Sequence, residues 1–160
     1  MKATELLRQQ HDEVKNLYVK FEQADDDDER QALFEEIADS LAAHAAIEER
    51  IFYPAIYGGD LTEHLREAVE EHLEMKREIA DLLAMTPDDE AFDAKMKVLM
   101  AMFEHHVGEE ERDILPRAEE QLEGRLDRLG TQMAQLFEQL MNDGASDDIP
   151  LETEQVAALK

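Results

Sequence analysis

The sequence reads LAAHAAIEERIFYP at residues 41–54, and a similar stretch returns as FEHHVGEEERDILP at residues 103–116. In both copies one His, His44 or His106, is followed four residues later by Glu-Glu-Arg and ten residues later by Pro. Four residues are slightly more than one turn of an α-helix, so the His and the first Glu of each copy project from the same helical face. Two such His-Glu pairs can converge on a dinuclear metal site.

The repeat extends into the segments on either side of these two stretches. Apolar residues recur at helical spacing around His11, and a matching stripe surrounds His72, 61 residues later. Strand-like alternation is missing, and the chain has only 6 Gly and 4 Pro, which predicts an all-α protein. Two helix pairs that each leave an apolar face uncovered predict an antiparallel up-down four-helix bundle.

A fifth apolar stripe, at about 122–142, predicts an additional C-terminal helix. This helix either covers the bundle or pairs with a second copy of the chain, and we favour covering because an exposed apolar stripe is unusual on a monomer. Asp, Gly, Ser and Pro become frequent after this stripe, from 142 to 150. We therefore assign 1–143 to the helical bundle, with a metal-binding part at about 6–120, and 144–160 to a linker and a poorly specified C-terminal segment. The oligomeric state stays open.

Composition narrows the function classes. The formal net charge of −25 at pH 7 disfavours nucleic acid and anionic membrane surfaces as partners. The chain has no Cys, which excludes thiol catalysis and Cys-ligated iron–sulfur clusters. We find neither a leader-like segment nor an apolar run of membrane-spanning length, and we expect a soluble, cytoplasmic protein.

Six polar residues occupy positions where the helical stripes require core residues: His11, His44, Glu48, His72, His106 and Glu110. Burying these groups without partners would cost several kcal/mol, and a shared cation removes that cost. Imidazole and carboxylate ligands together suit iron, zinc or manganese. The alternative is a metal-free network of hydrogen bonds, which we consider less favourable because such groups are rarely buried without compensation.

Other polar residues near the motif have less defined roles. His105 precedes the His of the second copy and has its own Glu four residues later, while Tyr18 lies two turns from His11 on the same face. Either is a candidate additional ligand. Glu49 and Glu111 are rotated away from the bundle axis, and we expect them at the surface or paired with Arg or with a ligating imidazole. His64 lies outside the apolar stripe and is interpreted as a surface residue.

Over roughly 6–120, the doubled His-x3-Glu-Glu motif with its downstream Pro resembles the hemerythrin family, specifically the HHE cation-binding domain of hemerythrin-like proteins. The resemblance implies two iron ions, with His11, His44, His72 and His106 as imidazole ligands and Glu48 and Glu110 as bridging carboxylates. Zinc or manganese are alternative metals. Family members bind oxygen, sense oxygen or iron, respond to nitric oxide and related stress, or decompose peroxide.

The chain departs from the oxygen carriers of that family. Their fifth His corresponds to Lys76 here, and their last carboxylate, often an Asp, corresponds to Glu111 and not Glu110. These departures argue against reversible oxygen carriage. The resulting hypothesis is a non-haem di-iron protein that binds or reacts with oxygen, peroxide or nitric oxide, and whether it is an enzyme stays open. A metal-sensing or metal-stabilised interaction domain without turnover is the alternative, and iron storage ranks last because ferritin-type sites use Glu-x-x-His spacing.

Overall fold

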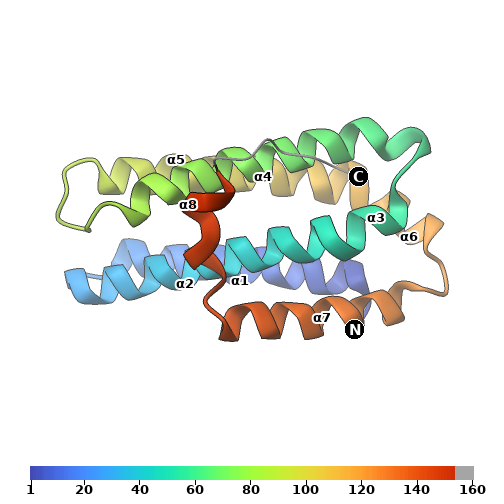
Figure 1. Ribbon diagram of the computed structural model, residues 1–160, viewed down its shortest axis with the longest axis horizontal. Helices are drawn as coiled ribbons and strands as arrows, with labels where there is room; N and C mark the ends of the chain where they lie inside the picture. The colour runs from blue at the N-terminus through green and yellow to red at the C-terminus, as the bar shows by residue number, and fades with distance from the viewer. Residues whose placement is uncertain (154–160) are drawn as a thin grey trace.

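The computed structural model describes residues 1–153. Within this range the chain is all-α, and its five long helices are α1 (Ala3–Gln23), α2 (Asp27–Ile47), α4 (Thr62–Leu83), α5 (Phe92–Glu109) and α7 (Leu126–Asn142) (Figure 1). The fold class predicted from the sequence is therefore confirmed. Over the same residues, no helix combines the length and the hydropathy that crossing a membrane requires.

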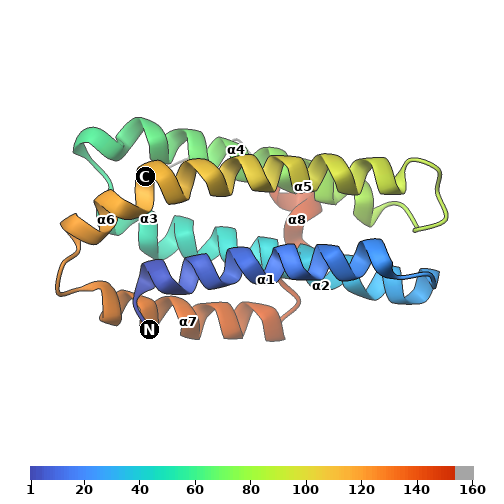
Figure 2. The same cartoon turned by 180° about the vertical axis from the view of Figure 1, so that it is seen from behind.

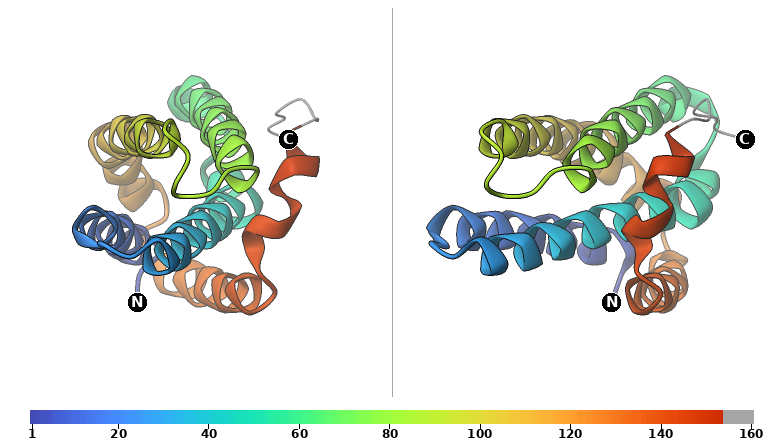
Figure 3. Two further views of the ribbon diagram at one scale, coloured as in Figure 1. Left: turned by 90° about the vertical axis from the view of Figure 1, so that its left-hand side faces the viewer. Right: turned by 60° about the vertical axis from the view of Figure 1, so that its left-hand side comes forward.

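The helices form an antiparallel up-down bundle with one additional helix. α1 packs on α2 and α4 packs on α5, and the turns that close both hairpins lie at the same end of the bundle (Figures 1 and 2). In the end-on view, α1, α2, α4 and α5 surround a common axis, and α7 lies outside the α1–α2 pair (Figure 3).

At the opposite end, α2 and α5 each pass into a π-helical turn and then a short α-helix. These elements are η1 (Glu48–Phe52) followed by α3 (Tyr53–Ile56), and η3 (Glu110–Ile114) followed by α6 (Leu115–Gln121). The N–H groups of Tyr53 and Leu115 bond to the carbonyls of Glu48 and Glu110, five residues back. The prolines that come next have no N–H to donate, so the wide turn occurs where regular α-helical bonding is interrupted.

Helix α7 covers the bundle, as the sequence predicts. It packs on α1 and α2 and buries Leu126, Gly130 and Met133. At Gly130 a Cβ atom would lie 2.0 Å from the backbone oxygen of Met1, so only glycine permits this approach of α7 to the N-terminus. The short 3-10 helix η2 (Gly59–Leu61) links α3 to α4.

After α7, the chain turns back across the bundle through the 3-10 helix η4 (Ala145–Asp148) and α8 (Ile149–Glu152) (Figure 3). Asp39 on α2 accepts hydrogen bonds from the backbone N–H and the hydroxyl of Ser146, at 2.8 and 2.5 Å. Ile149 is fully buried in the core. The described part of the segment interpreted as a linker is therefore packed, whereas 154–160 lies outside the described residues. The domain division at residue 143 stays a prediction.

The apolar core consists of two clusters separated by a polar layer. One cluster includes Val14, Leu41, Met75 and Phe103, and the other includes Leu7, Ile47, Phe52, Val69 and Ile114. Along the four bundle helices, the His and Glu residues predicted to bind metal lie between these two groups. The fold thus holds the polar groups inside the protein with apolar packing on both sides.

Candidate metal centre

The structure brings together all six residues that the sequence singles out. His11 comes from α1, His72 from α4, and His44 and His106 from the last turns of α2 and α5. Glu48 and Glu110 are the first residues of the two π-helical turns. All six are buried, with relative exposures of 0–4%.

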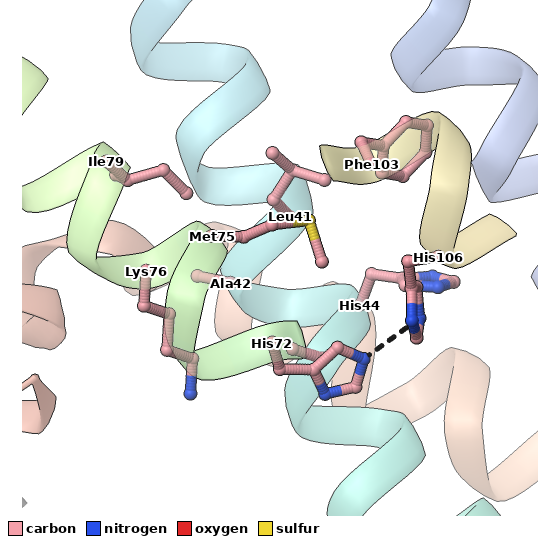
Figure 4. A pocket seen from close by; sticks show the side chains of 10 residues that line it. Leu41, Ala42, His44, His72, Met75, Lys76, Ile79, Phe103 and His106 are labelled. Carbon is pink, nitrogen blue, oxygen red and sulfur yellow. Dashed lines mark hydrogen bonds between the residues drawn. The ribbon is translucent and has the colours of Figure 1, made fainter. Parts of the chain in front are cut away.

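The four imidazoles form two pairs. Nε2 of His11 is 3.2 Å from Nε2 of His44. Nε2 of His72 is 3.2 Å from Nε2 of His106, and Figure 4 shows this second contact. Both pairs meet nearly edge to face, with interplanar angles of 63° and 65°. Each pair joins the two helices of one hairpin, α1 and α2 or α4 and α5, so the internal repeat of the sequence is also a repeat of geometry.

The two carboxylates connect the imidazole pairs. Glu48 Oε1 is 3.2 Å from His44 Nε2 and 3.1 Å from His72 Nε2. Glu110 Oε1 is 3.2 Å from His11 Nε2, while Glu110 Oε2 is 3.5 Å from His106 Nε2. Glu48 Oε1 is also 3.8 Å from His106 Nε2. Each carboxylate therefore approaches both imidazole pairs, as a carboxylate shared between two ions would.

In each of the four imidazoles, the second ring nitrogen, Nδ1, also has a hydrogen-bond partner. The partners of Nδ1 are Glu111 Oε1 for His11 at 2.9 Å, Gln10 Oε1 for His44 at 2.7 Å, Glu49 Oε2 for His72 at 2.9 Å and Glu71 Oε1 for His106 at 2.9 Å. Of the alternatives left open for Glu49 and Glu111, the structure shows pairing with imidazoles. Such outer partners fix the orientation of a His side chain and make it a better ligand.

These hydrogen bonds test whether a cation fits the cluster. Because carboxylate and amide oxygens only accept, Nδ1 carries the hydrogen, and a neutral imidazole then presents a lone pair at Nε2. Two such lone pairs 3.2 Å apart repel each other unless a cation lies between them. In addition, Glu48 Oε2 and Glu110 Oε1 are buried without a hydrogen-bond partner, a costly state that metal coordination would remove. The donor set therefore fits two cations.

Without metal, protons take the place of the missing positive charge. Burial lowers the pKa of His106, but the nearby carboxylates of Glu110, Glu48 and Glu71 outweigh this effect and raise the pKa well above its usual value. Burial conversely raises the pKa of Glu48, but the imidazoles around it, His44 foremost, bring the pKa well below its usual value. The ion-free cluster thus favours an ionised Glu48 carboxylate and a protonated His106 imidazole.

Sequence reasoning missed three residues at this site. Gln10 and Glu71 each precede a single His of the repeat, and their positions relative to His11 and His72 are the signal that was available. Tyr53 is fully buried, donates a hydrogen bond to Glu110 Oε2 at 2.6 Å and stacks on His72. Its counterpart in the second copy is Leu115, so the repeat gave no indication of its role.

The other candidate ligands lie elsewhere. His105 has a side chain that is 67% exposed and faces Glu71 and Glu109 outside the buried cluster. Tyr18 stacks on Phe21 in the apolar cluster beyond the polar layer, with ring centroids 6.1 Å apart. His64 is half-buried on α4.

A small pocket opens beside His44, His72 and His106 (Figure 4). The remainder of its wall is mostly apolar and includes Leu41, Met75, Ile79 and Phe103, together with Lys76. Its interior leaves about 10 Å³ for the centre of a water-sized molecule, which is close to the roughly 10–15 Å³ that one water needs by this measure. The pocket therefore suits a molecule of one or two heavy atoms.

Comparison with known proteins identifies the same motif-bearing region. A model of the hemerythrin HHE cation binding domain family matches residues 2–118. An uncharacterized protein of Mycobacterium tuberculosis is 29% identical over 143 residues, covering 88% of each chain. A DNA nickase of a Nostoc species is 31% identical over 114 residues, but this match covers only 32% of the nickase. The chain thus spans about a third of that relative's length.

A solved structure shows the same architecture. The crystal structure of a hemerythrin HHE cation binding domain-containing protein from Mycobacterium kansasii superposes with a TM-score of 0.79, and the match covers 89% of both chains. The two sequences are 29% identical. The match covers more of the chain than residues 2–118 and therefore extends into the part of the chain after residue 118.

Proposed function

This chain belongs to the hemerythrin HHE cation-binding domain family, and we propose that it holds two iron ions and reacts with oxygen, peroxide or nitric oxide. His11 and His44 would hold one ion and His72 and His106 the other, with Glu48 and Glu110 shared between them. Iron, when bound, would supply reversible one-electron chemistry to a small ligand. The partner on this account is a small molecule, and nothing in the composition favours nucleic acid or membrane.

The observation that carries the proposal is the joining of the two imidazole pairs by two carboxylates. Glu48 lies close to both His44 and His72, and Glu110 lies close to both His11 and His106. Two separate mononuclear sites would not need carboxylates shared in this way. A pair of ions can distribute charge that changes during a redox reaction, and shared carboxylates hold the pair together.

The remaining residues of the site position these groups. Glu49, Glu71 and Glu111 hold three imidazoles through Nδ1 and add negative charge that favours the more oxidised state of a bound ion. Tyr53 holds Glu110 through its hydroxyl. Burial, with the negative charge of Glu110 and Glu48, raises the pKa of Tyr53 well above its usual value, so this phenol keeps its proton.

The pocket supports the choice of substrate class. It lies against three of the four imidazoles, and its apolar wall and small volume favour diatomic molecules or peroxide over larger substrates. Lys76 lies on the pocket wall, at the position where the oxygen carriers of the family have a further His. The pocket therefore retains space beside the proposed ions.

Anaerobic loading with ferrous iron, followed by separate additions of oxygen, hydrogen peroxide and nitric oxide, tests the proposal. The visible spectrum should change on addition of at least one of these ligands, and the change should be lost in His44→Ala. His64→Ala is the matched control, because it removes a His of α4 outside the cluster, and it should behave as wild type.

Two results would overturn the proposal. One is iron binding that is unaffected by His44→Ala. The other is an iron-loaded protein that responds to none of the three ligands. If the second result were accompanied by a large loss of thermal stability on iron removal, a metal-stabilised interaction domain would be the better account.

A further inference from the structure

A second set of metal-ligating side chains lies on the surface, beside the buried cluster. His105 Nε2 is 3.2 Å from Glu109 Oε1 and 3.5 Å from Glu71 Oε2. His105 and Glu109 are four residues apart on α5, so they repeat the His106–Glu110 spacing one position earlier and on an outer face of the helix. Glu71 reaches them from α4.

The internal repeat of the chain shows that this outer set is particular to the second half. Glu71 corresponds to Gln10 in the first half, at the same place before the single His. His105 and Glu109 correspond to Ala43 and Ile47. The six proposed ligands of the two halves match, whereas these three differences bring one imidazole and two carboxylates together at one point on the second half.

The spacing of the donor atoms suits one small cation. The three side chains can offer ligand atoms that all lie within 4.8 Å of one another. Bonds of about 2.0–2.2 Å from a shared ion to nitrogen and oxygen place neighbouring ligand atoms roughly 3–3.5 Å apart. The distances from His105 to its two carboxylates fall in that range. Within residues 1–153, the ion pairs of Glu71 and Glu109 are formed with imidazoles.

We propose that Glu71, His105 and Glu109 form an outer site for a divalent first-row transition ion. One imidazole and two carboxylates suit zinc, manganese or ferrous iron, with water completing the coordination because His105 is 67% exposed. The high negative charge of the chain, −25 at pH 7, favours cation binding at its surface. The outer site does not depend on the redox chemistry proposed for the buried centre.

Glu71 joins the outer site to the buried centre. Its Oε1 accepts a hydrogen bond from His106 Nδ1 at 2.9 Å, while its Oε2 faces His105. An ion on Oε2 draws negative charge away from Oε1 and so weakens the support that Glu71 gives to the His106 imidazole. Occupation of the outer site therefore makes His106 a weaker electron donor.

Equilibrium dialysis against zinc with elemental analysis tests the outer site. The wild-type protein should bind one more zinc ion per chain than His105→Ala, and His64→Ala should match the wild type. Glu109→Gln is the second variant, because Glu109 pairs with His105 and is not one of the residues that hold the buried imidazoles at Nδ1. It should lose the outer ion and retain the buried ions.

The difference of one ion between wild type and His105→Ala does not depend on how many ions the buried centre holds. A wild-type count of three, falling to two in both His105→Ala and Glu109→Gln, supports both proposals. A count of one falling to zero supports the outer site and contradicts the buried pair. Equal counts in wild type and His105→Ala show that His105 only forms ion pairs with Glu71 and Glu109, and overturn the outer site.

Discussion

Gln10 and Glu71 occupy equivalent positions in the two halves of the chain, and each accepts a hydrogen bond from the Nδ1 of an imidazole on the neighbouring helix. The distances are 2.7 Å from His44 to Gln10 and 2.9 Å from His106 to Glu71. One partner is neutral and the other is a carboxylate, so the two ion positions differ in charge although their imidazoles match. The position of His72 and His106 is the more negative of the two.

Replacing Gln10 by Leu should weaken metal binding. The change keeps the size of the side chain but removes the acceptor that orients His44, and loss of such a partner typically lowers metal affinity by about 10–100-fold. Zinc affinity measured by competition with a chelator gives the comparison. Gln9→Leu is the control, because Gln9 is exposed and pairs only with Glu13. Equal affinities for the two variants would show that Gln10 does not support the site.

Replacing Tyr53 by Phe should destabilise the ion-free protein. The variant leaves Glu110 Oε2 buried without the phenol hydroxyl, and a hydrogen bond to a charged group contributes about 1.5–3 kcal/mol. Urea unfolding of ion-free protein measures the loss. Tyr57→Phe should change the free energy of unfolding by less than about 0.5 kcal/mol, because Tyr57 is exposed. An unchanged stability of Tyr53→Phe would contradict the assigned hydrogen bond.

Metal should stabilise the protein more strongly as the pH rises. The pKa of His106 is raised above 6.5 in the ion-free fold, because its carboxylate partners outweigh burial. The stability that His106 contributes is therefore fully present below pH 6.5 and is lost as the pH rises through the folded-state pKa. A metal ion must displace the proton on His106, so the affinity for metal increases as the pH rises.

This effect is measured by thermal melting with and without zinc. The pH range is about 6 to about 8, on both sides of neutral pH, where zinc affinities are usually compared. The difference between the two melting temperatures should widen as the pH increases, and zinc addition in weak buffer should release protons. A constant difference with no proton release would contradict the protonated His106 imidazole inferred for the ion-free cluster.

Two glycines should respond in opposite directions to the same substitution. Gly130→Ala places a Cβ 2.0 Å from Met1 O, and overpacking of this kind costs about 1–3 kcal/mol. Gly108 lies in α5 with no atom within 4 Å of an added Cβ, so Gly108→Ala should stabilise the protein by up to about 1 kcal/mol. Urea unfolding measures both. Destabilisation by Gly108→Ala would contradict the open helical position of Gly108 in α5, and no destabilisation by Gly130→Ala would contradict the packing of α7 on the N-terminus.

The long helices and the six buried polar residues could be predicted because helical periodicity places them directly. His44 and Glu48 share a face whatever surrounds them, and the repetition of this pair at His106 and Glu110 implied a second half of the site. The support of His11 by Glu111 was harder to predict, because it joins residues 100 positions apart. Which acceptor an imidazole finds depends on how the helices are rotated against each other.

Tyr53 and the segment after α7 illustrate the same limit. Tyr53 follows a π-helical turn, and the wider turn changes the direction of every later side chain relative to α-helical spacing. At 144–150 the composition is typical of a loop, but Asp39 anchors Ser146, and Ile149 fills a space in the core. So short a stretch carries no helical periodicity, so the burial of Ile149 could not be predicted.

The most direct test of the central claim is a crystal structure of the iron-loaded protein with anomalous diffraction data collected at the iron absorption edge. The account predicts two iron peaks inside the bundle, one between His11 and His44 and one between His72 and His106, with Glu48 and Glu110 contacting both. An iron-loaded crystal with no peak among these six side chains, or with a single ion there, would contradict it.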